Sequence, residues 1–358
     1  MGAKPPLDMS GRRRTVFVTG ANGYIGAAVC RAFVGAGWTT FGLVRKPEAV
    51  QDLMAAEVIP VVGTFDDLRF LGPVYEKATG FDAIVSCTEN ISGYADHFNQ
   101  VMVLVKALAE RSKQQVIRSL VLWSSGCKDY GTTETHGASA LAPHTEASPT
   151  NPPDILRQRT ENCLCIFDHT DLFDAVLVRP TSVFGRSSSY YGAMLSWVAN
   201  EAAAGSGTLK IPANPNSIMH ATHVDDCGLA YLAVSEQADR SAIAGKIFNI
   251  SGHRYETAQE VGEALAKEYG FERGVEFVSP ADAPSSFPEG LHFVFNFSQW
   301  VSSESIRQIT GWTDLRPLFS ENLNVYRWAY EAALARGDIN ITVVEGRVGS
   351  NFRRLGSM

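Results

Sequence analysis

The sequence lacks the features that mark membrane proteins and nucleic-acid-binding proteins. No apolar run reaches the roughly 20 residues needed to span a bilayer. Acidic residues outnumber basic ones, 38 to 31, for a net charge of −7, whereas a nucleic-acid surface needs an excess of Lys and Arg. Residues 1–14 are polar and basic, without the apolar core of a signal peptide. We therefore expect a cytoplasmic protein with a small-molecule substrate and with no membrane or nucleic-acid partner.

Cysteine is also scarce, and it is not arranged for cross-linking or metal binding. The six cysteines are Cys30, Cys87, Cys127, Cys163, Cys165 and Cys227. Their spacing fits neither a disulfide framework nor a zinc site, and most of them fall in apolar segments. We expect free, mostly buried thiols in a reducing compartment, and no bound metal.

Strands and helices alternate along the first half of the chain. The expected strands are Thr15–Thr19, Thr39–Val44, Val58–Val62, Ala83–Cys87, Leu120–Trp123 and Ala175–Arg179. The expected helices between them include Tyr24–Ala36, Phe98–Glu110 and Ile155–Phe167. Continuous apolar runs suit parallel strands that are covered on both faces. The alternation predicts an α/β protein with a doubly wound parallel sheet of the Rossmann type.

The alternation changes after Pro180. Helices are expected at Ala193–Ala204, Asp226–Glu236, Ala258–Tyr269 and Leu318–Ala335, and a further strand of the first sheet at Lys246–Ile250. The expected domains are a flexible N-terminus (1–14), a Rossmann dinucleotide-binding domain (15–183, with the strand near 246–250), a smaller substrate-binding lobe (184–245 and 251–345) and a flexible tail (346–358).

The most informative motif is a glycine-rich turn, Thr19-Gly20-Ala21-Asn22-Gly23-Tyr24-Ile25-Gly26. Gly20 permits a sharp exit from the strand. Gly23 lets backbone N–H groups reach a pyrophosphate, and Gly26 lets the next helix press against the sheet. The N-terminus of that helix supplies partial positive charge to the anion. Because a strand precedes the turn and a helix and second strand follow it, the pattern predicts a dinucleotide site.

With these glycines in the form TGxxGxxG, the chain resembles the extended branch of the short-chain dehydrogenases/reductases. That branch includes nucleotide-sugar epimerases, dehydratases and dihydroflavonol-type reductases. The further marks of the resemblance are Asn99, Ser124-Ser125-Gly126 before Tyr130-Gly131, Arg179-Pro180, Val183-Phe184-Gly185, His223-Val224-Asp225-Asp226 and Gly311-Trp312. The resemblance covers the chain from about Thr15 to Glu331, and it implies a nicotinamide dinucleotide and, by analogy, a homodimer.

The resemblance also implies which residues contact the dinucleotide. They are Gly20, Asn22, Gly23, Tyr24, Ile25, Gly26, Arg45, Thr64, Phe65, Cys87, Thr88, Arg157, Pro180 and Val183.

The end of the second strand indicates the form of the cofactor. A carboxylate there favours NAD, and a cation favours the 2′-phosphate of NADP. This chain has Arg45 and Lys46 at that place, and an Arg fork suits a phosphate dianion. We expect NADP, with NAD as the alternative if the two cations are only a solvated pair. Thr64 takes the place of the family's Asp near the adenine, and whether Asp66 compensates stays open.

The family's Ser, Tyr and Lys carry out its chemistry, and here the chain departs from the family. The Tyr and Lys normally stand as Y-x-x-x-K on the helix after the fifth strand. In this chain that segment, Asn151 to Glu161, contains neither residue, and the alignment puts Pro153 at the Tyr position and Arg157 at the Lys position. An Arg can hold the nicotinamide ribose but cannot share a proton as Lys can.

Other residues are therefore needed for catalysis. Ser125 is the best match for the family Ser, with Ser124 second. Tyr130, Tyr190, Tyr191 and His220 are the possible replacement proton donors. We select Ser125, Arg157 and Tyr190 as the catalytic candidates. Glu89, after the fourth strand, is either a base or ribose ligand or a solvated loop residue.

The segment His223-Val224-Asp225-Asp226 admits two interpretations. It is either part of a metal site or the start of a helix. Capping of that helix by Asp225 is the simpler interpretation.

Two functions fit these features. The first is an NADP-dependent oxidoreductase that transfers a hydride to or from a small carbonyl or alcohol of secondary metabolism. Phe287, Phe293, Phe295, Phe297 and Trp300 in the lobe favour an apolar or aromatic substrate, although the same residues also suit a core. The alternative is a repurposed scaffold that binds NAD(P) for redox sensing or for non-redox chemistry such as isomerisation or cyclisation. A sugar-nucleotide epimerase fits less well, because such enzymes normally keep Y-x-x-x-K.

Overall fold

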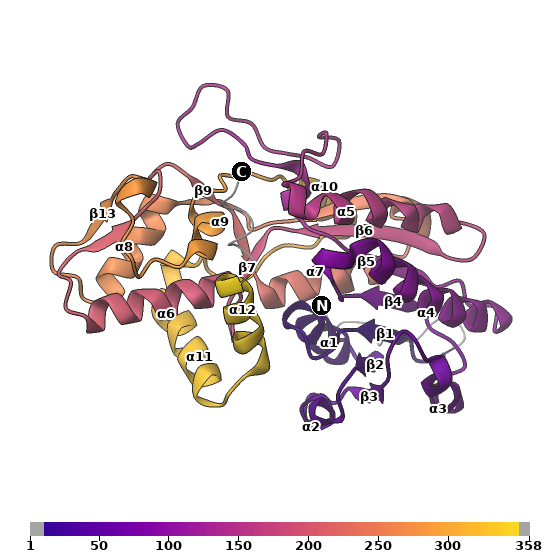
Figure 1. The fold of residues 1–358 in the computed structure, drawn as a ribbon. Coiled ribbons are helices and arrows are strands. Elements are labelled where there is room, and N and C mark those ends of the chain that lie inside the picture. The colour runs from indigo at the N-terminus through magenta and orange to yellow at the C-terminus, as the bar shows by residue number, and fades with distance from the viewer. Residues whose placement is uncertain (1–10, 351–358) are drawn as a thin grey trace.

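The computed structural model describes residues 11–350, and its centre is a parallel sheet of seven strands (Figure 1). The strands are β1 (Thr15–Thr19), β2 (Thr39–Val44), β3 (Ile59–Val62), β4 (Ala83–Ser86), β5 (Leu120–Ser124), β6 (Asp174–Pro180) and β11 (Lys246–Ile250). Their order is β11-β6-β5-β4-β1-β2-β3, and each neighbouring pair is parallel. The predicted doubly wound sheet is confirmed, with strand ends shifted by one residue in places.

Helices cover both faces of this sheet, and side chains alternate between the two faces along each strand. Val16 and Val18 of β1 join the core on one side, whereas Phe17 joins the core on the other. The first face is covered by α1 (Tyr24–Gly35), α2 (Val50–Ala55), α7 (Val224–Glu236) and α10 (Glu304–Thr310). The second face is covered by α3 (Leu71–Lys77), α4 (Tyr94–Gln114), α5 (Arg157–Asn162) and the 3-10 helix η6 (Cys163–His169).

The single helix predicted over Ile155–Phe167 is wrong. The structure has a 3-10 turn at Asp154–Leu156, then the short α5, then η6. Pro153 keeps an extended backbone (φ −53°, ψ 146°) just before the first of these turns. Because two prolines precede the segment, the chain enters its helical conformation late and in short pieces.

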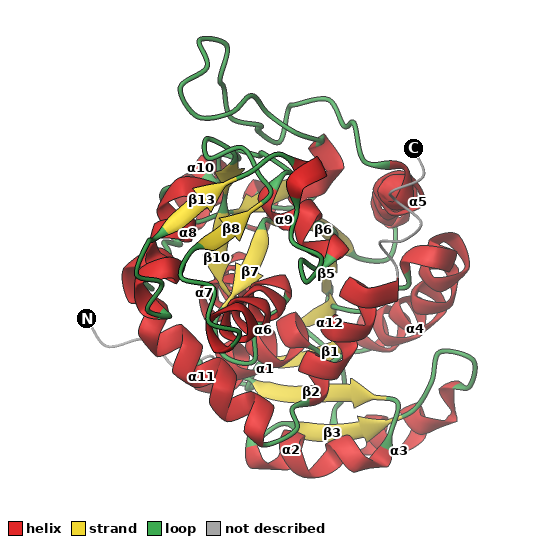
Figure 2. Ribbon diagram, turned by 60° about the vertical axis from the view of Figure 1, so that its left-hand side comes forward, coloured by secondary structure: helices red, strands yellow, loops and turns green. Residues whose placement is uncertain are grey.

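The remaining elements form a lobe beside the carboxyl ends of the strands (Figures 1 and 2). Its helices are α6 (Tyr190–Ala203), α8 (Ala258–Glu268), α9 (His292–Phe295), α11 (Leu323–Ala335) and α12 (Ile339–Ser350). Its strand pairs are β7 (Ser182–Phe184) with β10 (Ala221–His223), β8 (Leu209–Ile211) with β13 (Val275–Phe277), and β9 (Ile218–Met219) with β12 (Glu256–Thr257). Phe184, Tyr191, Phe319 and Tyr326 pack together in its core, with ring centroids 4.7–6.2 Å apart.

Both ends of the described chain contact the rest of the protein. Arg12 forms an ion pair with Asp82 at 2.6 Å, and the Arg14 carbonyl accepts a hydrogen bond from the Thr39 amide. At the other end, residues 346–350 belong to α12, which buries Ile341 and Val348 in the lobe core. Side chains in or near 11–14 and 346–350 find partners, and the flexible segments expected there stay a prediction. Residues 1–10 and 351–358 lie outside the described part.

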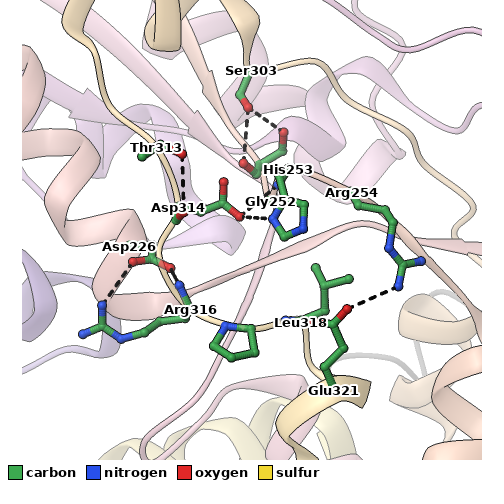
Figure 3. A network of polar contacts seen from close by, with 12 residues as sticks. Asp226, Gly252, His253, Arg254, Ser303, Thr313, Asp314, Arg316, Leu318 and Glu321 are labelled. Carbon is green, nitrogen blue, oxygen red and sulfur yellow. Dashed lines mark hydrogen bonds and ion pairs between the residues drawn. The ribbon is translucent and has the colours of Figure 1, made fainter.

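A polar network fastens the C-terminal segment to the sheet domain, and Figure 3 shows it at close range. Asp226 is fully buried and accepts a hydrogen bond from the Arg316 amide at 2.9 Å. The indole of Trp312 donates to the Asp226 carbonyl at 3.0 Å. Nearby, Asp314 accepts from His253 at 2.6 Å and pairs with Arg307 at 2.7 Å. The two late sequence marks, Asp225-Asp226 and Gly311-Trp312, thus meet in space and hold the lobe in place.

Within residues 11–350, no helix combines the length and apolarity needed to cross a membrane. All six cysteines lie in this range as free thiols, and Cys30, Cys127, Cys163 and Cys227 are buried.

Candidate active site

The glycine-rich turn joins β1 to α1, and at two of its glycines a side chain would not fit. Gly20 has φ +64°, and a Cβ there would lie 2.9 Å from Thr88 Cγ2 and 3.0 Å from the Cys87 carbonyl oxygen. A Cβ on Gly26 would lie only 2.1 Å from the Gly20 carbonyl oxygen. Gly23 donates its N–H to that same oxygen at 2.8 Å. The turn is therefore a tight backbone cradle that only glycine can form.

This cradle fits the pyrophosphate of a dinucleotide. Helix α1 begins at Tyr24 with no side-chain cap and no acidic residue in its first turn, so its first N–H groups remain for an anion. Beside the turn, the hydroxyl of Thr88 is buried and makes no hydrogen bond within the described chain. Such a group normally has a partner, and a bound phosphate or ribose would supply one. The residues present therefore match the cofactor that the sequence predicts.

Some residues predicted to contact the cofactor have side chains that are engaged within the protein. The Tyr24 hydroxyl donates to the Gly185 carbonyl at 2.6 Å, and its phenol is buried. Burial, followed by the charge of Asp225, raises the pKa of Tyr24 well above its ordinary value. Pro180 at the end of β6 and Val183 in β7 are buried, and Val183 packs in the sheet-domain core.

The residues predicted to hold the adenosine end of the cofactor follow β2 and β3. Arg45 and Thr64 are exposed there, and the Phe65 ring lies 5.7 Å from the His97 ring, nearly perpendicular to it. Burial lowers the pKa of His97, and the charge of Arg45 acts in the same direction. His97 Nε2 is buried and has no hydrogen-bond partner in the described residues. Sequence reasoning missed His97, because nothing in α4 marks it as lying beside Phe65.

A polar cluster lies at the carboxyl end of β5, and fully buried Asp129 is at its centre. Ser125 donates its hydroxyl to Asp129 at 2.6 Å, and Thr160 donates at 2.9 Å. Two guanidinium groups also reach this carboxylate, Arg159 at 2.6 Å and Arg179 at 3.2 Å. Ser125 is therefore held in a fixed orientation by a charge-assisted hydrogen bond.

Arg159, rather than the predicted Arg157, joins this cluster. Arg159 bridges Asp129 and Glu89, the latter at 3.0 Å, and its side chain is 9% exposed. Burial lowers its pKa, but Asp129 and Glu89 outweigh that effect and raise the pKa. Arg157 instead pairs with Asp154 and is 58% exposed. Arg157 takes no part in this cluster because its side of α5 faces solvent, and its contact with the dinucleotide stays a prediction. Glu89 is an ion-pair partner of Arg159 rather than a solvated loop residue.

Of the four replacement donors, Tyr190 has its environment set by this cluster. Burial raises its pKa. The charge of Arg347 lowers the pKa, that of Glu89 raises it and that of Arg159 lowers it. Its phenol therefore stays protonated near neutral pH.

The other three candidates are engaged elsewhere. Tyr130 donates its hydroxyl to Asn249 at 2.9 Å, and Tyr191 is buried in the lobe core. His220 uses both ring nitrogens, one with the Gly252 carbonyl and one with the Val301 amide. These three side chains therefore serve packing and main-chain support.

Lys128 is a second residue that sequence reasoning missed. It precedes Asp129 and lines a small cavity with Tyr191, His220, Met219 and Phe297. The cavity lies where the loop after β5 meets the lobe, and its volume of about 10 Å³ has room for about one water molecule. A lysine among polar loop residues gives no signal in the sequence.

The segment His223-Val224-Asp225-Asp226 is structural. The ring of His223, not the side chain of Asp225, caps α7 by accepting the Asp225 amide at 3.1 Å. Asp225 pairs instead with Arg31 at 2.7 Å and Arg186 at 2.8 Å. No group of three or more His, Cys, Asp or Glu side chains in the described range is placed to hold a metal ion.

Helix α12 packs against α6, and its first turn reaches the glycine turn. Asn340, in its first turn, donates to the Asn22 carbonyl at 3.5 Å. Arg347, near its other end, lies close enough to lower the pKa of Tyr190 against the larger effect of burial. The C-terminal helix thus borders both halves of the site.

The parallel sheet, the glycine cradle and the polar cluster at the strand ends define a Rossmann-fold dinucleotide-binding enzyme. The chain belongs to the NAD dependent epimerase/dehydratase family, which residues 16–251 match. It is 24% identical, over 305 residues, to an uncharacterized protein of Saccharomyces cerevisiae, covering 83% of this chain and 93% of that one. A local match of 45% over 56 residues covers 16% of this chain and 19% of an uncharacterized Schizosaccharomyces pombe protein.

Solved structures show the same fold at low identity. The dTDP-glucose 4,6-dehydratase of Bacillus anthracis, in complex with NAD, gives a TM-score of 0.67 at 16% identity over 89% of this chain and 97% of that one. The UDP-glucose 4-epimerase of Thermotoga maritima, with UDP-glucose, gives 0.64 at 16% identity over 89% and 99%. At this identity the likeness extends to the fold alone.

Proposed function

We propose that the protein is an NADP-dependent oxidoreductase that transfers a hydride to or from a small, apolar or aromatic carbonyl or alcohol. The observation that carries the proposal is the position of the polar cluster. Ser125, Glu89 and Arg159 gather at the carboxyl ends of β4 and β5, directly beside the strand end that carries the glycine cradle. In open α/β sheets this edge is where ligands bind.

The dinucleotide supplies or accepts the hydride when it is bound. The backbone of Gly20–Gly26 would hold its pyrophosphate, and Arg45 would bind the 2′-phosphate as a guanidinium fork. Arg45 has no ion pair with an acidic side chain within residues 11–350, so its charge is available for that phosphate.

The chain's own residues would then orient the substrate and supply its proton. Ser125 donates its proton to Asp129, so toward a substrate it would act as the acceptor of a hydrogen bond from an alcohol hydroxyl. Tyr190 would donate its phenolic proton to the substrate oxygen as the hydride arrives. Burial raises the pKa of Tyr190, so the phenol carries its proton near neutral pH, although the same shift makes it a weaker acid.

A repurposed scaffold that binds the dinucleotide without turnover is the second candidate. One observation favours it: Arg159, the buried cation of the polar cluster, is neutralised by two carboxylates and cannot lower the pKa of a phenol as a free lysine would.

One assay separates the two candidates. Binding of NADPH and NADH is followed by the fluorescence of the reduced nicotinamide, and oxidation of NADPH is then followed by absorbance with a panel of apolar and aromatic ketones and aldehydes. Turnover with any of them supports the oxidoreductase. Tight binding without turnover across the panel supports the scaffold, and absence of binding contradicts both.

A further inference from the structure

The position of helix α12 is set by a few local contacts. After α11, Gly337 has a left-handed φ of +70° and turns the chain. Asp338 then caps α12, because its carboxylate accepts a hydrogen bond from the Asn340 amide at 2.9 Å. Ile341 and Val348 bury one side of α12 in the lobe core. These contacts decide where the helix begins and which of its sides faces the lobe.

A second side of α12 flanks this buried one and is more exposed. It consists of Asn340, Val343 and Arg347, which recur at intervals of three and four residues and so share one face of the helix. Val343 is 45% exposed, and Arg347 is exposed as well. Asn340, at one end of this face, donates to the Asn22 carbonyl of the glycine turn at 3.5 Å. A rise of about 1.5 Å per residue places Arg347 roughly 10 Å further along the helix.

The far end of this face lies beside Tyr190. Helix α12 packs against α6, and Tyr190 is the first residue of α6. Burial raises the pKa of Tyr190, and the charge of Arg347 lowers it more than the charge of Arg159 does. The exposed face of α12 therefore extends from the glycine cradle to the predicted proton donor.

Arg347 is also the cation of this region that has no acidic partner. It forms no ion pair with an acidic side chain within residues 11–350. By contrast, Arg159 and Arg179 of the polar cluster both pair with Asp129. Residues 151–161, where the resemblance places a lysine that holds the nicotinamide ribose, contain no lysine. A free cation is thus absent from the segment after β5 and present on α12.

We propose that α12 forms one wall of the dinucleotide site and that Arg347 binds the nicotinamide half of the cofactor. This inference rests on the function proposed above and adds a binding residue to the same site. With the pyrophosphate at the cradle and hydride transfer beside Tyr190, the nicotinamide half would lie along the exposed face of α12. The guanidinium of Arg347 would donate hydrogen bonds to the ribose hydroxyls. Asn340 would hold the helix against the glycine turn and so place Arg347.

The test is calorimetry of the full chain with two ligands, NADPH and adenosine 2′,5′-diphosphate. The second ligand carries the adenosine and its 2′-phosphate but has no nicotinamide half. Arg347→Gln should weaken NADPH by about tenfold, as the loss of one charged hydrogen bond implies. The same variant should weaken adenosine 2′,5′-diphosphate by less than about twofold, because the lost contact is not made to that ligand.

Two further variants control for charge and position. Arg347→Lys keeps the charge and should retain most of the NADPH affinity. Arg336→Gln removes the same charge from an exposed position at the end of α11. It should leave both affinities within about twofold of those of the unaltered protein, since exposed charges act weakly at a distance.

The outcomes separate this inference from the proposed function. If NADPH does not bind the unaltered protein, the proposed function fails and the inference fails with it. If NADPH binds but Arg347→Gln leaves its affinity unchanged, or weakens both ligands equally, only the role of Arg347 fails. A loss in Arg347→Lys as large as that in Arg347→Gln also contradicts a contact made by charge. Should Arg347→Gln fold incompletely, the comparison still decides, because an unfolded fraction lowers the apparent affinity for both ligands alike.

Discussion

The two halves of the site are built in opposite ways. The glycine cradle uses backbone atoms from a single turn. Steric contact decides which residues it accepts: a Cβ on Gly26 would lie 2.1 Å from the Gly20 carbonyl oxygen. The polar cluster uses side-chain charges that come from distant segments: Arg159 reaches Glu89 across 70 residues of sequence. The cradle can bind a dinucleotide with little help from its surroundings, whereas the cluster exists only when the whole domain is folded.

Because of this contrast, substitutions in the two halves should be detected by different measurements. Changes in the cradle should affect binding of the dinucleotide, and changes in the cluster should affect the folded state or the reaction. The predictions below run from the largest expected effect to the smallest.

Arg159→Gln should destabilise the protein by about 3–5 kcal/mol, because it leaves the buried Asp129 charge short of a partner. Urea denaturation measures the change. Arg157→Gln is the matched control from the same short helix, and it should change stability by less than about 0.5 kcal/mol because its ion pair is exposed. Equal effects in the two variants would show that the cluster does not depend on Arg159.

Gly26→Ala should weaken NADPH binding by about 100-fold or more, which corresponds to ~2.7 kcal/mol. Its Cβ would force the cradle to open. Gly35→Ala, in the last turn of the same helix, meets no atom within 4 Å and should leave affinity unchanged. Fluorescence titration compares the two variants, and an unaffected Gly26→Ala would mean that the cofactor binds elsewhere.

Arg45→Asp should weaken NADPH by about tenfold more than it weakens NADH, because the lost contact is a charge-assisted one to the 2′-phosphate. Arg336→Asp, an exposed change of the same charge at the end of α11, controls for the change in net charge. Equal losses for the two dinucleotides would remove Arg45 as a phosphate ligand and leave NAD as the cofactor.

With a substrate identified, Ser125→Ala should lower kcat/KM by about tenfold, because one oriented hydrogen bond to the reacting oxygen is lost. Ser124→Ala is its neighbour control: the Ser124 hydroxyl pairs with Tyr231 at 2.8 Å, on the α7 side of the sheet. An undiminished rate in Ser125→Ala takes this serine out of the mechanism.

The cradle and the sheet could be predicted from the sequence because their signals are local. Gly20, Gly23 and Gly26 lie within one turn, and each of the seven strands carries its own apolar run. The coarse position of Ser125 followed from its place after β5 for the same reason.

The cluster could not be predicted in detail because its contacts are long-range. Arg157 and Arg159 lie on one helix of six residues, too short for periodicity to show which side faces the sheet. Lys128 meets Phe293 across 165 residues of sequence, so no spacing marks the pair. The course of α12 is set by burial of Ile341 and Val348 in the lobe core. The sequence of this segment, which contains glycines, does not indicate that burial.

The most direct test of the account is a calorimetric titration of the unaltered protein with NADPH and then with NADH. The account predicts a heat of binding for both, one site per chain, with NADPH bound more tightly. A lack of heat with either dinucleotide would contradict the reading of the glycine turn as a pyrophosphate cradle.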